Sequence, residues 1–233
     1  MAYWSRFDRW FRAEIRLWRD IRGPDGVLLD ANRVSAVAKN WRTFTDADRK
    51  SWFIARVVQY YVAQIRDISH NGFIATIPTC CLLDGLGGYA FYSNTYRKRG
   101  PVKKTGRGAR PGEVRSGEAF TFFVQTYFPR KELRALAAQI YSQLRCNLVH
   151  NLGTTMPLTG NSSSSPVKRR RYPLRNPQGA DTGVRSTVDE IQVDHFIRNA
   201  MVAVSLYLRD LRLATHSDPL NTNFLDRHKA IYR

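Results

Sequence analysis

The sequence contains little that could build a metal site or a disulfide framework. It has three cysteines in 233 residues, and two of them, Cys80 and Cys81, are adjacent instead of forming CxxC pairs. Metal-ligand spacing is also missing among four of the histidines, His70, His195, His216 and His228. We therefore expect a protein of the reducing cytoplasm that binds no metal and no cofactor.

Long apolar runs and acidic residues are scarce as well. The amino terminus alternates Trp and Phe with Arg, which predicts neither a signal peptide nor a membrane span, so we expect a soluble protein without a membrane partner. For this aromatic segment, packing on the core or in a dimer is favoured over a position on a membrane surface. The chain has 19 Asp and Glu against 37 Lys and Arg, a net charge of +18 that favours a polyanionic partner such as RNA.

Strand patterns and internal repeats are also missing, whereas apolar residues recur at helical spacing through most of the chain. A capping arrangement at Thr45 to Asp48 and a capping box formed by Thr187 and Glu190 indicate two helix starts. We expect an all-α bundle. Its predicted helices cover about 3–21, 46–69, 74–93, 118–127, 130–150, 187–214 and 223–231.

Three glycines, Gly85, Gly87 and Gly88, interrupt the helical pattern predicted over 74–93. A phosphate-binding loop would follow a strand and end in a Lys-Ser or Lys-Thr pair, and neither feature is present. We therefore predict that the glycines allow close packing between helices.

Two segments outside the helical patterns hold most of the excess positive charge. Residues 95–115 carry eight Lys or Arg and one acidic residue, and residues 155–186 carry six and one. Both segments are rich in Gly, Pro or Ser, so we expect two long basic loops that contact RNA phosphates. The predicted RNA-binding residues are Arg97, Lys98, Arg99, Lys103, Lys104 and Arg107 in the first segment and Lys168, Arg169, Arg170 and Arg171 in the second.

One stretch, residues 144–150 at the end of the strongest helical pattern, combines residue types that suit catalysis. Arg145 offers a permanent cation whose donors match phosphate oxygens, and His150 can transfer a proton near neutral pH. An Arg-x4-His match is expected about 0.6 times by chance in a chain with 29 Arg and 5 His. On spacing alone, we would favour a structural interpretation, in which Arg145 offsets the helix dipole and His150 caps the helix end.

Helix geometry limits how Arg145 and His150 could act at one site. Residues five apart on an α-helix are separated by about 140°, so Arg145 and His150 share a face only if the helix unwinds before His150. Alternatively, a second copy of the chain supplies the opposite wall, because a symmetric dimer would bring two Arg and two His into one cleft. Asn147 is either a donor in that cleft or a surface amide. Asp84 either supports the site from a neighbouring helix or is a solvated or capping acid.

The residues around this motif resemble the HEPN family of helical nucleases. The family signature is Arg-x4-6-His at the end of a bundle helix, and Arg145 to His150 has its shortest form. Three stretches occur in an order similar to that of HEPN proteins: LDGLGGY at 83–89, FFVQTYFP at 122–129 and YSQLRCNLVHN at 141–151. The resemblance covers about residues 45–215, between an amino-terminal helical extension, 1–44, and a carboxy-terminal tail or short helix, 216–233.

The resemblance implies a metal-independent endoribonuclease that acts as a homodimer in toxin or antiviral defence, with an antitoxin or defence-complex protein as a further partner. It implies proton transfer by His150 and stabilisation of the phosphorane-like transition state by Arg145. Active members often carry a polar residue directly after the arginine, where this chain has Cys146. The alternative is therefore a catalytically silent HEPN scaffold that binds nucleic acid or a partner protein.

Overall fold

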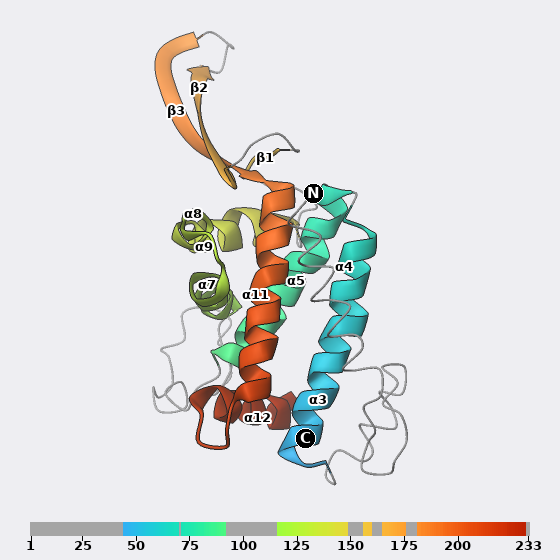
Figure 1. Cartoon of the computed structure of the whole chain (residues 1–233). Helices are drawn as coiled ribbons and strands as arrows, with labels where there is room; N and C mark the ends of the chain where they lie inside the picture. The colour runs from blue at the N-terminus through green and yellow to red at the C-terminus, as the bar shows by residue number, and fades with distance from the viewer. Residues whose placement is uncertain are drawn as a thin grey trace.

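Helices form most of the chain that the structure describes (Figure 1). The structure is a computed structural model, and it describes residues 44–69, 71–91, 116–148, 156–159, 165–175 and 181–231. The predicted amino-terminal helix, the first basic segment and His150 lie outside these residues. The described part is mostly helical, as expected for an all-α protein, and it also contains a small three-stranded sheet.

The first described helical stretch begins at a capping box, as the sequence predicts. The Thr45 hydroxyl accepts a hydrogen bond from the Asp48 N–H at 3.2 Å, and the Asp48 carboxylate accepts one from the Thr45 N–H at 2.9 Å. These two bonds satisfy donors that the first turn of a helix leaves free. The stretch contains α3 (Asp46–Arg56), the π-helix η3 (Val57–Val62) and α4 (Ala63–Asp67), which confirms the helix predicted over 46–69.

The central element is α5 (Gly72–Ala90), which packs against α7 (Ser116–Tyr127), α11 (Val193–Leu213) and α12 (Pro219–Ile231) (Figure 1). Asn71 caps its start by accepting a hydrogen bond from the N–H of Ile74. By length and composition α5 could cross a membrane, but more than half of it is buried by neighbouring helices. A core helix of a soluble protein has the same properties.

The glycines of α5 have different environments. At Gly87 a Cβ atom would lie 2.4 Å from the carbonyl oxygen of Ala119 on α7, so the prediction of close helix packing is confirmed there. A Cβ atom at Gly88 would make ordinary contact with Arg227, 3.7 Å away. At Gly85 it would meet nothing within 4 Å, so the packing prediction is wrong for this residue.

The segment predicted as one helix over 130–150 is divided. After α8 (Lys131–Ala135), the chain turns at Leu136, and α9 (Ala137–Gln139) leads directly into the π-helix η4 (Ile140–Cys146). Helical backbone continues to Leu148. The apolar pattern that predicted a helix is nevertheless correct, because five of its positions are buried: Leu133, Ala137, Ile140, Leu144 and Leu148.

The second basic segment is in part a β-hairpin, so the prediction of a long loop over 155–186 is wrong. β2 (Val167–Arg175) pairs antiparallel with β3 (Asp181–Gln192), and β1 (Leu158–Thr159) pairs in parallel with the end of β3. The strand order is β1-β3-β2, and the hairpin extends away from the helical body in Figure 1. The predicted helix start at Thr187 and Glu190 is also wrong, because both residues lie in β3.

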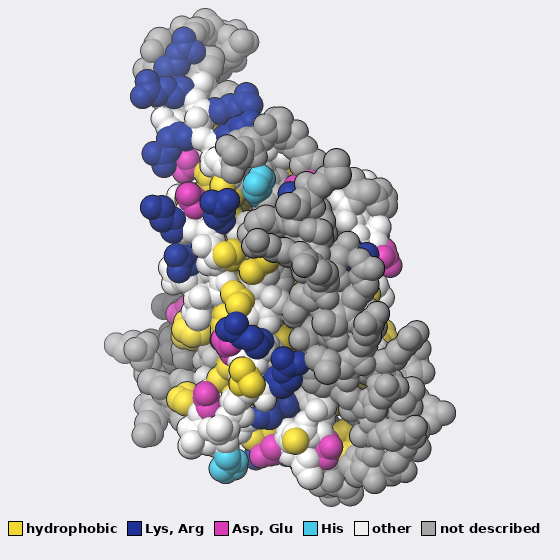
Figure 2. Space-filling view, viewed as in Figure 1, with side chains coloured by type: hydrophobic (Ala, Val, Ile, Leu, Met, Phe, Trp, Pro, Cys, Tyr) yellow, Lys and Arg dark blue, Asp and Glu magenta, His cyan; other side chains and the backbone are white. Residues whose placement is uncertain are grey.

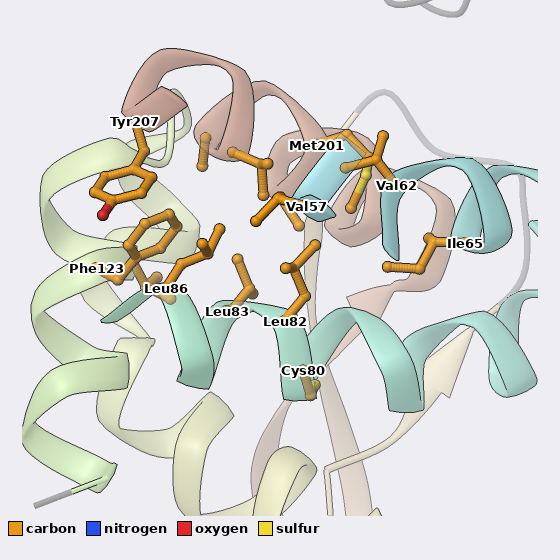
Figure 3. Close-up of a cluster of buried hydrophobic side chains, with 14 of the residues drawn as sticks. Val57, Val62, Ile65, Cys80, Leu82, Leu83, Leu86, Phe123, Met201 and Tyr207 are labelled. Atoms are coloured by element: carbon orange, nitrogen blue, oxygen red, sulfur yellow. The ribbon is translucent and has the colours of Figure 1, made fainter. Parts of the chain in front are cut away.

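Two helices complete the described chain. α11 begins at Val193, directly after β3, and α12 contributes the buried residues Phe224 and Leu225 to the core. The helices predicted over 187–214 and 223–231 are thus confirmed with different starting points. Figure 3 shows side chains of η3, α5, α7 and α11 meeting in this core, among them Val57, Leu83, Phe123 and Tyr207. The same cluster includes Leu144 of η4, so the core fixes the two elements that carry the candidate site.

Candidate functional site

Arg145, the arginine of the predicted motif, forms an ion pair with Asp84. Its Nη2 atom on η4 donates a hydrogen bond to Oδ2 of Asp84 on α5 at 2.5 Å. The two side chains are 15% and 16% exposed, so the pair is largely shielded from water. The sequence left the position of Asp84 open, and the structure brings it against the motif arginine.

A tyrosine holds the guanidinium from another direction. The ring of Tyr141 has its centroid 5.6 Å from the guanidinium carbon of Arg145, within the range of a cation–π contact. Tyr141 is itself packed on Phe120, at a ring separation of 5.6 Å, and on Gly117, where a Cβ atom would lie 2.8 Å from the ring. Sequence analysis did not identify Tyr141 as a site residue. Its position four residues before Arg145 on a helix was the available signal.

The positive charge of Arg145 is maintained in this setting. Burial alone would lower the pKa of its guanidinium, but the Asp84 carboxylate outweighs burial, and the pKa is raised. Its Nε atom is buried and makes no hydrogen bond within the described part of the chain. The guanidinium donors that do not reach Asp84 are of the kind that bind phosphate oxygens in pairs. The guanidinium of Arg145 thus stays charged and is held in place by Asp84 and Tyr141.

Arg145 lies near the end of a π-helical stretch. Hydrogen bonds from residue i to i+5 widen each turn of a π-helix, and such turns are frequent at functional sites. The 140° separation expected for Arg145 and His150 assumed a regular α-helix, whereas the backbone is π-helical up to Cys146. His150 lies outside the described residues, so the two predicted arrangements, an unwound helix end and a second subunit, stay predictions.

The two residues that follow Arg145 are both partly exposed. Cys146 carries a free thiol. The side-chain amide of Asn147 donates a hydrogen bond to the carbonyl oxygen of Gln143, one turn earlier, at 3.1 Å. One of the amide's donors is therefore used within its own helix, and a role for Asn147 in catalysis stays a prediction.

The two adjacent cysteines lie on α5 next to the ion pair. Burial raises the pKa of the Cys80 thiol, and the neighbouring Cys81 adds to this effect while Arg145 opposes it. Partial burial also raises the pKa of the Cys81 thiol, and Arg145 again opposes this shift. Cys80 is thus a buried residue of the core, whereas Cys81 as a whole is exposed. Both thiols are protonated at neutral pH and are poor nucleophiles.

The predicted RNA-binding residues of the second basic segment follow one another along β2. The Nε atom of Arg169 lies 2.9 Å from Oδ1 of Asp189, and the Nε atom of Arg170 lies 2.9 Å from Oε2 of Glu190. Lys168 is partly exposed and Arg171 is exposed. The predicted residues of the first segment lie outside the described chain: Arg97, Lys98, Arg99, Lys103, Lys104 and Arg107.

An open cavity of about 610 Å³ lies beside Tyr141. Aromatic and polar side chains line it, and one of them, Tyr141, also contacts Arg145. The lining residues are Phe91, Gly117, Glu118, Thr121, Phe122, Gln125, Ala138 and Tyr141.

Among the residues described, no group of three or more His, Cys, Asp or Glu side chains is placed to hold a metal ion. Comparisons with models of protein families, with curated proteins and with solved structures found no match to the chain.

Proposed function

We propose that this protein is a metal-independent endoribonuclease with a HEPN-like bundle, which acts in the cytoplasm as a homodimer in toxin or antiviral defence. One observation carries the proposal: Arg145 is held by Asp84 and Tyr141 at the end of a helix, and His150 follows five residues later. A mostly helical body is compatible with this family's fold. The net charge of +18 supports RNA as the substrate.

The proposed reaction is internal transesterification of RNA. The ribose 2′-oxygen bonds to phosphorus while the bond to the 5′-oxygen breaks, which leaves a 2′,3′-cyclic phosphate and a 5′-hydroxyl. In the proposal, His150 removes the proton of the 2′-hydroxyl or protonates the leaving oxygen, and a dimer would supply one histidine for each task. Arg145 stabilises the charge that develops on the phosphate oxygens. Asp84 acts as a positioning residue that fixes the direction of the guanidinium.

Incubation of cellular RNA with the purified protein in EDTA tests the proposal. We expect the wild-type protein to cut RNA, and Arg145→Ala and His150→Ala to lower the rate on the order of a hundredfold or more. Arg134→Ala is a matched control, since Arg134 is an exposed arginine of α8. Intact RNA with the wild-type protein, or equal cutting by the variants, would reject the nuclease.

The alternative is a silent scaffold that binds nucleic acid or a partner protein. Two observations favour it: Cys146 stands where active family members often have a polar residue, and Asp84 offsets part of the charge that Arg145 offers to a phosphate. In the same assay a scaffold would bind RNA and leave it uncut.

A further inference from the structure

We infer that the β2–β3 hairpin, called the arm from here on, binds double-helical nucleic acid through a row of arginines on one of its faces. The inference deepens the proposed function, on which it rests for the choice of nucleic acid as the polyanion. It specifies a double-helical nucleic acid as the ligand, whereas the charge of the chain alone would suit any polyanion.

The arm is anchored at its base. Ile191 is fully buried, and its N–H donates a hydrogen bond to the carbonyl oxygen of Pro157 at 2.9 Å. The N–H of the next residue, Gln192, donates to the carbonyl oxygen of Pro166 at 3.0 Å. β1 pairs with these same two residues, and β3 passes into α11 without an intervening loop. The helical body therefore sets the direction in which the arm points (Figure 1).

Opposite charges are paired near this base. Asp189 and Glu190 contact Arg169 and Arg170 on β2, and both carboxylates are mostly shielded from water. The next residue toward the tip is the exposed Arg171. Figure 2 shows the acidic side chains near the base of the arm and Lys and Arg side chains farther along it. The outer part of the arm thus offers positive charge to a partner.

The register of the strands places three arginines on one face. Arg169 lies opposite Asp189, Arg171 opposite Thr187, and Arg185 opposite Pro173. Because alternate residues of a strand share a face, Arg169, Arg171 and Arg185 lie on the same side of the arm. All three side chains are exposed. Arg171 and Arg185 are diagonal neighbours on this face, so their side chains can contact the same anionic partner.

The dimensions and composition of this face favour a duplex over a single strand. The paired positions span roughly 26 Å, at about 3.3 Å per residue. The major groove of B-form DNA, about 12 Å wide, admits a two-stranded ribbon, whereas A-form RNA offers a wide, shallow minor groove between its phosphate rows. Proteins that hold single strands add aromatic side chains on which bases stack. Between Val167 and Pro173, and opposite them, the arginine-bearing face has no aromatic residue. The arginine-bearing face therefore suits a ligand with two rows of phosphates, which DNA and RNA duplexes both provide.

Binding of the full-length chain to labelled nucleic acids tests the inference. The protein carries Arg145→Ala and is kept in EDTA, so that the probes stay intact. The probes are an RNA duplex, a DNA duplex and an unstructured single-stranded RNA of equal length. The arm variant is Arg171→Gln with Arg185→Gln. The control is Arg209→Gln with Arg212→Gln, which removes the same charge from exposed positions at the far end of α11.

We expect the arm variant to weaken binding to a duplex on the order of tenfold and to reduce the slope of log K against log salt by about two. Binding to the single strand changes less, and the control variant behaves as the parent protein does. Arg171→Lys with Arg185→Lys keeps the charge and should keep the slope, which separates loss of charge from loss of the hairpin.

Two results would overturn the inference: equal losses in the arm and control variants, or equal losses on duplex and single strand. Loss on either duplex supports the arm. A loss seen with DNA alone would support the arm and count against RNA as the substrate. If binding depends on the arm but the wild-type protein, which keeps Arg145, does not cut RNA, only the nuclease proposal is rejected. If the wild-type protein cuts RNA but binding does not depend on the arm, only the inference about the arm is rejected.

Discussion

Arg145 depends on two neighbours that come from different parts of the chain. Asp84 precedes it by 61 residues and lies on another helix, whereas Tyr141 is one turn away on the same helical stretch. Both neighbours restrict the side chain, so in the proposed enzyme the guanidinium would be in place before a substrate arrives. A group that is already oriented needs little reorganisation during the reaction, which makes its charge more effective.

Asp84→Asn is expected to weaken both folding and cleavage. The substitution leaves the shielded cation of Arg145 without a carboxylate, so the free energy of unfolding should fall by about 1–3 kcal/mol in urea titrations. The double variant Asp84→Asn with Arg145→Gln should recover part of this loss, because no unpaired charge remains. Simple additivity of the two single changes would contradict the energetic importance of the pair.

Two glycines of α5 provide a matched pair for the packing of this helix. Gly87→Ala places a Cβ atom against backbone of α7 and should destabilise the protein by about 1–3 kcal/mol. Gly85→Ala meets open space inside a helix and should stabilise it by about 0.5–1 kcal/mol. Thermal unfolding of both variants measures the difference. Similar shifts in Tm for the two variants would show that helices α5 and α7 are not in close contact at Gly87.

His228 should make folding stability dependent on pH. Burial lowers its pKa to about 3, with a backbone hydrogen bond opposing and Arg49 adding to the effect. An unfolded histidine titrates near pH 6.5, so its contribution is complete above that pH and is lost as the pH falls toward 3. Between about pH 7.5 and 5, the free energy of unfolding should decrease by about 2 kcal/mol.

The control for this pH dependence is His228→Phe, because aromatic rings surround the side chain. The rings of Trp52, Phe53, Tyr89 and Phe224 have centroids 5.1 to 6.2 Å from that of His228. Phenylalanine keeps these contacts and does not titrate. Denaturant titrations of the variant should therefore give nearly equal stabilities at the two pH values, and a wild-type protein that behaves in the same way would contradict the role of His228.

At the scale of elements, sequence patterns located the helices and missed the strands. Helical periodicity was informative because each helix buries one side, as α11 does with Phe196, Ala200 and Tyr207. None of the β2 side chains that the structure describes, those of 167–171, is buried, and the strand lacks the alternation of apolar and polar residues that predicts a strand. The β-branched residues of β3 between Val184 and Ile191 were the signal that could have identified it.

Only those residues of the candidate site that lie close together in the sequence could be predicted. Arg145 and His150 are close in sequence, so their spacing could be recognised together with the motifs around them. Asp84 could not be assigned, because its contact depends on how α5 and η4 pack against each other. The π-helical turn was not predictable either, since it changes the backbone without changing the apolar pattern.

The arm should be the least protected of the described elements in hydrogen exchange. A two-stranded ribbon without a covering layer is only marginally stable, whereas the core helices exchange through larger unfolding events. We expect fast exchange in peptides from 167–175 and slow exchange in peptides from α5 and α11, measured by mass spectrometry. Addition of a nucleic acid duplex should slow exchange in the arm. Arm amides as protected as those of α11 in the free protein would contradict this expectation.

At the scale of the whole molecule, one core carries both the candidate site and the arm. Leu144 of η4 and Ile191 of β3 belong to the same buried cluster, which also contains residues of α5, α11 and α12. The ion pair of Arg145 and the base of the arm are therefore fixed to one body. In the proposed enzyme this arrangement lets the arm hold a structured region of RNA while Arg145 and His150 act on a neighbouring phosphate.

The most direct test of the proposed enzyme is the chemistry of the RNA ends that it leaves in EDTA. We expect the wild-type protein to produce 2′,3′-cyclic phosphate and 5′-hydroxyl ends, detected by mass spectrometry of a defined oligonucleotide. Arg145→Ala should produce these ends at a rate lowered on the order of a hundredfold or more, and Arg134→Ala should produce them as the wild-type protein does. An uncut oligonucleotide with the wild-type protein, or 5′-phosphate ends, would contradict catalysis by Arg145 and His150.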